Sequence, residues 1–129
     1  MKKIKIFFKI GFYIANIILI IFYLYPGSLL GWALYNDFSI QPQITKNFVI
    51  SSNHFYLFIL FSSLGVFSFH NTKKINFLIL YLFILSIILE LFHVIIPIRA
   101  FEMSDLFGNI AGVILVVIIY KVIIKYVKT

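Results

Sequence analysis

The stretch Ile75–Ile96, INFLILYLFILSIILELFHVII, decides the fold of this chain. Apart from Glu90 and His93 near its end, the stretch carries no acidic or basic residue. A helix of this length covers about 33 Å, which matches the hydrocarbon core of a lipid bilayer. Pro97 follows directly, and proline cannot continue a helix. The stretch therefore predicts a transmembrane helix that ends just before this proline.

Three more apolar runs lie on either side of this stretch. Residues 6–25 and 48–69 precede it, and residues 104–124 follow it. Of the 129 residues, 63% are hydrophobic and 12% are charged, which is more apolar surface than a soluble domain of this size can bury. We therefore predict an all-α membrane protein with four transmembrane helices, at about 6–25, 48–69, 75–96 and 104–124. Residues 1–129 would form one integral membrane domain.

The basic residues mark the ends of these predicted helices. The net charge of +7 comes mainly from three groups of lysines: Lys2, Lys3, Lys5 and Lys9; Lys73 and Lys74; and Lys121, Lys125 and Lys128. The other two loops hold only Lys46 and Arg99, which Asp37 and Glu102 offset. The positive-inside rule then places both termini on the cytoplasmic side. Because these charges flank apolar runs, they favour lipid headgroups as partners and argue against nucleic acid.

A more polar segment joins the first two predicted helices. Pro26 and Gly27 end the first helix, and a short amphipathic patch follows, formed by Leu29, Leu30, Trp32, Leu34 and Tyr35. Polar residues and a proline then predict a loop up to residue 47. We expect this segment to be a tether that lies on the membrane surface, because no particular residue supports the alternative of a lid over a site.

The predicted topology gathers polar side chains at the outer ends of the helices. They are His54, Glu90, His93, Arg99, Glu102, Asp105 and Asn109. Polar groups are costly to keep in or beside a bilayer, so a cluster of them indicates a functional site. The inner halves of the helices consist almost entirely of Ile, Leu, Val and Phe.

Two interpretations of this cluster rest on the hydrogen bonds and charges of its side chains. It could be a network that joins helices, with Asp105 capping the fourth helix. It could instead be a pocket open to the outside, which we favour because leucine would join helices at lower desolvation cost. In the pocket, Glu90 and Asp105 are candidate catalytic residues. The candidate ligand-binding residues are Arg99, Asn109, His93, His54 and Glu102. No nucleophile motif or phosphate-binding loop accompanies them, so the sequence leaves open whether the protein is an enzyme.

A metal site is the third interpretation. Glu90 and His93 have the i,i+3 spacing that helical bundles use for metals, and His54 and Asp105 could complete the set of ligands. A single Glu-x-x-His pair is common by chance, and the four groups serve a polar network equally well. We therefore predict neither a metal nor a cofactor. The absence of cysteine excludes disulfides and thiolate metal sites.

Residues 90–112 resemble the signature of VanZ-like membrane proteins, which reads roughly E-x-x-Q, P-G-R and D-x-x-x-N-x-x-G. The residues that carry the resemblance, without a gap, are Glu90, His93, Pro97, Arg99, Phe101, Glu102, Asp105, Asn109 and Gly112. His93 replaces the usual Gln, and Ile98 replaces the usual Gly before the arginine. The second-helix motif of the family is met loosely by His54, Phe61 and Gly65, with the histidine about one turn early.

The resemblance implies an accessory protein of the bacterial envelope, in the cytoplasmic membrane, since the family's namesake is linked to teicoplanin resistance. We expect an outward-facing pocket that binds or acts on outer-leaflet lipid headgroups or lipid-linked wall precursors. The alternative is a non-enzymatic accessory protein that packs against another membrane protein. Its small residues Gly108, Ala111 and Gly112 would suit such a helix contact, although packing within the chain explains them as well.

Overall fold

The computed structural model describes residues 2–47 and 49–127, and the regular structure in these ranges is entirely helical. Its elements are α1 (Lys2–Leu24), α2 (Leu29–Tyr35), α3 (Ser52–Phe69), α4 (Ile75–Leu91), a 3-10 turn (Phe92–Val94) and α5 (Met103–Val127). Four of the helices, α4 together with its 3-10 turn being one, are long and apolar enough to cross a membrane. The predicted class, an all-α membrane protein with four transmembrane helices, is confirmed.

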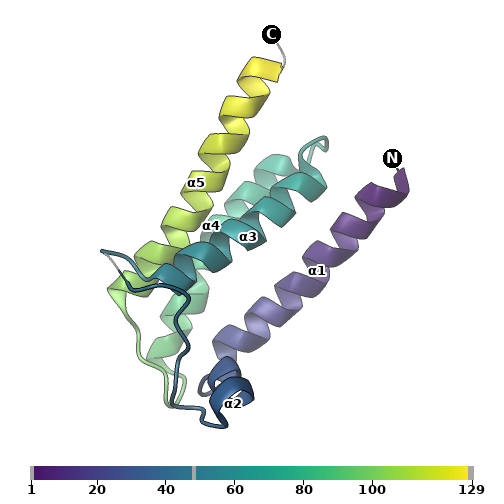
Figure 1. Cartoon of the computed structure of the whole chain (residues 1–129). Helices are drawn as coiled ribbons and strands as arrows, with labels where there is room; N and C mark the ends of the chain where they lie inside the picture. Colours follow the sequence, from purple (N-terminus) through teal and green to yellow (C-terminus); the bar gives the residue numbers. More distant parts are fainter. Residues whose placement is uncertain (1, 48, 128–129) are drawn as a thin grey trace.

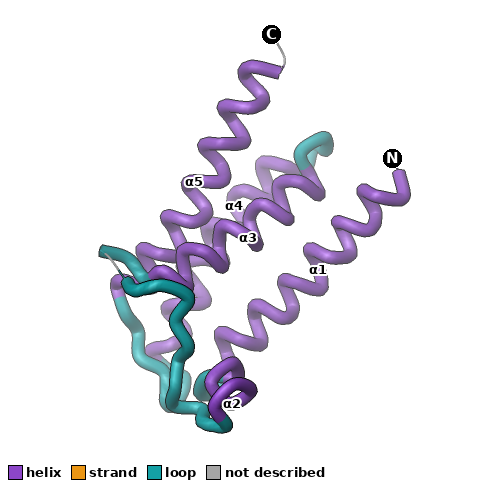
Figure 2. The backbone as a smooth tube through the Cα atoms, in the orientation of Figure 1, coloured by secondary structure: helices purple, strands orange, loops and turns teal. Residues whose placement is uncertain are grey.

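The helices run up and down, so that the chain has two distinct ends (Figures 1 and 2). Both termini lie at one end together with the turn between α3 and α4, and we call this the terminal end (Figure 1). Helix α2 and the loops at residues 36–47, 49–51 and 95–102 lie at the other, which we call the loop end (Figure 2).

The helix bounds differ from the predicted ones in ways that have local causes. Helix α4 ends at Leu91 and tightens into the 3-10 turn, earlier than the predicted Ile96. Pro97 has no N–H to donate to the carbonyl of His93, and its ring would clash with that carbonyl, so a regular α-helix cannot continue through this segment. Two predicted features lie outside the described residues. They are the start of the second span at Phe48 and the part of the C-terminal basic group at Lys128.

Helix α3 is the centre of the bundle, because its contacts with α5 and α1 are the most extensive between any two helices. Its contact with α5 is the closest, and two glycines of α5 allow it. A Cβ atom at Gly108 would lie 2.8 Å from the carbonyl oxygen of Ser51, and one at Gly112 would lie 2.7 Å from that of Phe55. Small residues let membrane helices approach to backbone contact in this way. The two glycines therefore serve packing within the chain, and the predicted contact with another membrane protein stays a prediction.

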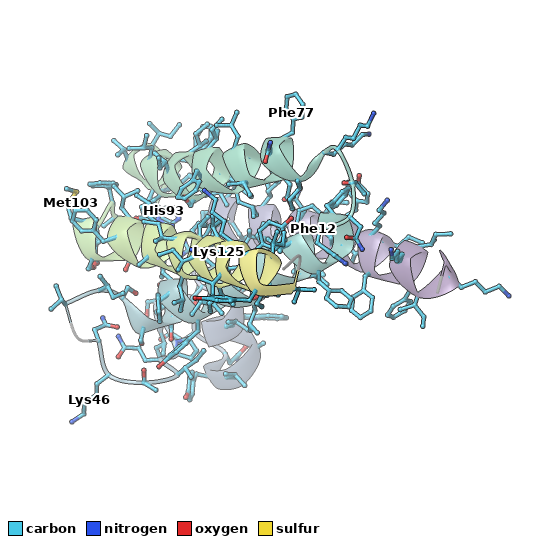
Figure 3. The ribbon with its side chains drawn as sticks, turned by 90° about the horizontal axis from the view of Figure 1, so that it is seen from above. Phe12, Lys46, Phe77, His93, Met103 and Lys125 are labelled. Carbon is cyan, nitrogen blue, oxygen red and sulfur yellow. The ribbon has the colours of Figure 1, made fainter. Side chains whose placement is uncertain are left out.

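The outward faces of the helices are apolar, as a lipid environment requires. Phe77 on α4 is 77% exposed and points away from the other helices, whereas Phe12 on α1 is buried and stacks on Phe61 of α3 (Figure 3). In the loop end, Lys46 extends away from the helices (Figure 3). Among the described residues, buried polar side chains of several helices come together at the loop end.

Candidate functional site

Helix ends position the polar side chains that the sequence predicts to converge. His54 lies in the first turn of α3, and Glu90 lies in the last turn of α4. Asp105 and Asn109 lie one turn apart near the start of α5. A backbone hydrogen bond of 3.1 Å from Ser51 to the carbonyl of Ser104 joins the starts of α3 and α5. The three helix ends therefore meet at one level of the bundle, and His54 belongs to the cluster.

Tyr23, near the end of α1, is the residue that sequence reasoning missed. Its side chain is buried, and its hydroxyl donates a hydrogen bond of 2.7 Å to Asn109 Oδ1. The same hydroxyl lies 3.0 Å from His54 Nδ1. A tyrosine at the end of an apolar helix is typical of the membrane interface, so the sequence alone gave it no role in the site. Its hydroxyl needs a partner when it is buried, and α3 and α5 provide one each.

The amide of Asn109 joins α5 to three other helices. The Nδ2 atom donates to the carbonyl of Ser86 on α4 at 3.1 Å, and Oδ1 lies 3.1 Å from His54 Nδ1. With the bond from Tyr23, these contacts use both ends of a side chain that is completely buried. Asn109 therefore acts as a bridge in the structure, and the predicted contact between Asn109 and a ligand stays a prediction.

Glu90 and His93 form a buried pair at the end of α4. Glu90 Oε1 lies 3.2 Å from His93 Nδ1 and accepts a hydrogen bond of 3.2 Å from the backbone nitrogen of Glu102. The other ring nitrogen of His93 lies 3.1 Å from the carbonyl oxygen of Tyr23. Both ring nitrogens of His93 therefore have partners within the chain. The side chain of Glu102 points elsewhere, to Ser104.

Arg99 holds the end of α1. Its Nη2 atom donates to the carbonyls of Phe22 and Gly27 at 2.8 and 2.7 Å, and its Nε atom donates to that of Tyr25 at 3.3 Å. Carbonyls in the last turn of a helix lack partners within the helix, and an arginine satisfies them well. Burial lowers the pKa of the guanidinium, while Tyr23 and the carboxylates of Glu90 and Asp105 oppose this effect. The group stays charged because its usual pKa is far above neutral.

A cavity of about 460 Å³ opens beside this cluster. His54, His93 and Arg99 line it on the side of the bundle, and α2 and residues 41–44 line it on the other side. The segment predicted to be a tether therefore covers the cluster. Helix α2 is held close to the following loop, because a Cβ atom at Gly31 would overlap the carbonyl oxygen of Ile40. Neither Glu90 nor Asp105 lines this cavity, so their catalytic roles stay predictions.

The fold and the cluster together define a multi-pass helical membrane protein with a buried polar site at one end. Comparison of the chain with protein-family models, curated proteins and solved structures finds no match. The function is therefore inferred from the geometry of the site.

Proposed function

We propose that the cavity at the loop end binds an outer-leaflet membrane lipid, with an anionic headgroup at Arg99 and an acyl chain between α1 and α3. One observation carries the proposal. The cavity, whose wall includes the polar side chains of the cluster, and an apolar groove of about 360 Å³ between α1 and α3 share three wall residues, which are Phe22, Leu30 and Leu57. A cavity with polar groups in its wall beside a groove with apolar walls alone suits an amphiphile.

The cavity has polar side chains in its wall, as a headgroup requires, and the groove has apolar walls, as an acyl chain requires. His54, His93 and Arg99 place polar nitrogen atoms in the wall of the cavity. Apolar residues alone line the groove, among them Ala15, Leu19 and Leu64. The hydrogen bonds of Arg99 to α1 use Nε and Nη2, so Nη1 remains to face an anion. An arginine that is already oriented loses little freedom when it binds a phosphate.

The side of the membrane and the ligand class follow from the sequence. The lysine pattern favours a cytoplasmic terminal end, which turns the loop end and its cavity outward. The resemblance of residues 90–112 to the VanZ-like signature favours a protein of the bacterial cytoplasmic membrane. A lipid-linked wall precursor would then be a second source of the same anionic headgroup chemistry, and a link to glycopeptide (teicoplanin) resistance would act through it.

Lipid retention tests this proposal. The full chain, purified in mild detergent, is mixed with vesicles of phosphatidylglycerol or phosphatidylcholine and analysed by native mass spectrometry. We expect selective retention of the anionic lipid. Leu57→Trp fills the wall that the cavity and the groove share, so it should reduce retention several-fold. Leu80→Trp is the matched control, because Leu80 is 57% exposed on α4 and lines neither space.

Equal retention of the two lipids, or equal losses in the two tryptophan variants, contradicts the proposal. The orientation of the protein in the membrane is checked separately with Ile44→Cys. The chain has no other cysteine, and Ile44 lies at an exposed site of the loop end. A membrane-impermeant thiol reagent should label it on intact cells. Labelling only after the cells are opened would place the cavity on the cytoplasmic side.

A further inference from the structure

Three side chains from three different helices meet at the cluster, and two of them, Glu90 and Asp105, do not line the proposed lipid cavity. The three are His54 of α3, Glu90 of α4 and Asp105 of α5, and one ligand atom of each lies within 4.8 Å of the other two. His54 Nε2 lies 3.3 Å from Asp105 Oδ2, and His54 Nδ1 lies 3.8 Å from Glu90 Oε2. The set combines one imidazole with two carboxylates.

The hydrogen bonds around His54 determine which of its nitrogens carries the proton. The bond from Asn109 Nδ2 to Ser86 fixes the amide, so that Asn109 presents its oxygen to Tyr23 and His54. The Tyr23 hydroxyl gives its single proton to that oxygen, and His54 Nδ1 must therefore be the donor to both. This leaves Nε2 of a neutral His54 as a lone pair that faces a carboxylate oxygen of Asp105.

Glu90 contributes a second group that lacks a partner. The carboxylate is completely buried, and its Oε1 atom is satisfied by His93 and by the backbone of Glu102. Among the described residues, nothing donates to Oε2, which is also buried. A buried carboxylate oxygen without a donor is strongly unfavourable. An unsatisfied oxygen and two opposed lone-pair donors at one point are the environment that a cation relieves.

We propose that His54 Nε2, Asp105 Oδ2 and Glu90 Oε2 bind a first-row divalent cation, Zn²⁺ or Mn²⁺. Metal bonds of about 2.0–2.2 Å hold neighbouring ligand atoms about 3.4 Å apart in a tetrahedral shell, close to the 3.3 Å between His54 and Asp105. Glu90 Oε2 lies 3.8 Å from His54 Nδ1, so its carboxylate must turn toward Nε2 when the ion binds. Asn109 orients His54 through Nδ1, as outer partners orient metal-bound histidines.

Three protein ligands leave a position open on the ion, which is the arrangement of a site that binds a further ligand. The Asp105 side chain is 19% exposed and provides the access route, whereas Glu90 is completely enclosed. His93 is not a ligand, because both of its ring nitrogens already have partners. The competing explanation is an imidazolium at His54 that is paired with both carboxylates, and it requires no metal.

Metal content of the purified full chain separates these explanations. The protein, with a tag that holds no histidine, is stripped with a chelator and dialysed against micromolar Zn²⁺ or Mn²⁺. We expect one ion per chain. Loss of an outer partner typically lowers metal affinity roughly 10–100-fold. His54→Gln and Asp105→Asn each remove a metal ligand, so they should lower the affinity by more than this. Tyr23→Phe should fall within that smaller range.

The matched control is His70→Gln, because His70 lies at the opposite end of α3 and bonds only to the carbonyl of Phe67 through its ring. It should bind the ion as the wild type does. A wild type that binds no ion, or His54→Gln and Asp105→Asn variants that bind like it, overturns the site and favours the imidazolium.

A second measurement on the wild type covers variants that fail to fold. Electron–nuclear double resonance of the Mn²⁺-loaded protein should detect one imidazole nitrogen at bonding distance, and its absence overturns the proposal. The lipid and metal proposals are tested separately, since one is measured by retained lipid and the other by retained metal.

Discussion

The two ends of the bundle hold α3 and α5 in different ways. At the loop end the helices touch through Gly108 and Gly112, and polar side chains of four helices are joined to one another. At the terminal end α5 diverges from α3 (Figure 1). A cleft of about 900 Å³ lies between the two helices there. Val66 and Val116 are among the apolar residues of this cleft.

The difference shows what associates helices in a membrane. Lipid tails are as apolar as leucine, so apolar side chains gain little by packing on one another there. Small residues gain close contact, and polar residues gain partners that lipid cannot supply. The loop end has both, whereas at the terminal end the cleft is bridged by a hydrogen bond of 3.2 Å from the Tyr120 hydroxyl to the carbonyl of His70.

The largest effect should follow from adding one carbon at the close contact. In Gly112→Ala the new Cβ would lie 2.7 Å from the carbonyl oxygen of Phe55 and 2.9 Å from Phe58 Cβ, so α3 and α5 must separate. We expect a loss of about 1–3 kcal/mol in unfolding free energy, measured by denaturation in detergent micelles. Gly11→Ala is the control, because nothing lies within 4 Å of its new carbon. Equal effects would mean that the close contact does not hold this end together.

A smaller effect should follow from removing the polar bridge. Asn109→Leu leaves Tyr23, His54 and Ser86 without their shared partner, so we expect a loss of about 1–2 kcal/mol in unfolding free energy. Asn16→Leu serves as the control, because Asn16 accepts one hydrogen bond, from Tyr81, and is only partly buried. The same denaturation measurement applies. If the control loses as much, the loop end is not specially stabilised by its polar groups.

The helices could be predicted because their causes are local. Long apolar runs specify a helix in lipid, and clustered lysines mark its ends. The end of α4 was misplaced because Pro97 acts on the residues before it. The covering role of residues 26–47 could not be predicted, since it depends on a backbone contact of Gly31 with Ile40 that only the folded chain brings together.

The sequence predicted that the polar side chains of the site lie close together, but not their contacts, and the Glu102 side chain turns to Ser104 instead. Polar residues stand out in an apolar chain, which is why Glu90, His93 and Asp105 were found. Tyr23 was missed because its partners lie on distant helices. Arg99 was expected to clamp a ligand, yet it also binds the carbonyls at the end of α1. Pro26 and Gly27 indicate this role in the sequence, because they end the helix and leave its last carbonyls without helical partners.

The smallest effect should come from the loop that carries Arg99, and it should be stabilising. Ile98 has a φ of 65°, in the left-handed region. That region costs an L-residue roughly 1–2 kcal/mol, whereas a glycine adopts it freely at an entropic cost of about 0.5–1 kcal/mol. Ile98 is 77% exposed, so Ile98→Gly removes little packing and should raise the unfolding free energy by up to about 1 kcal/mol.

The control for this change is Ile95→Gly, because Ile95 is 73% exposed but has a φ of −109°. Glycine relieves no strain there, so we expect this variant to lose stability. Opposite signs for the two variants in the same denaturation assay would show that the loop end keeps a strained residue beside Arg99. Losses in both would mean that the exposed Ile98 side chain, through its contact with lipid, outweighs the strain of its backbone.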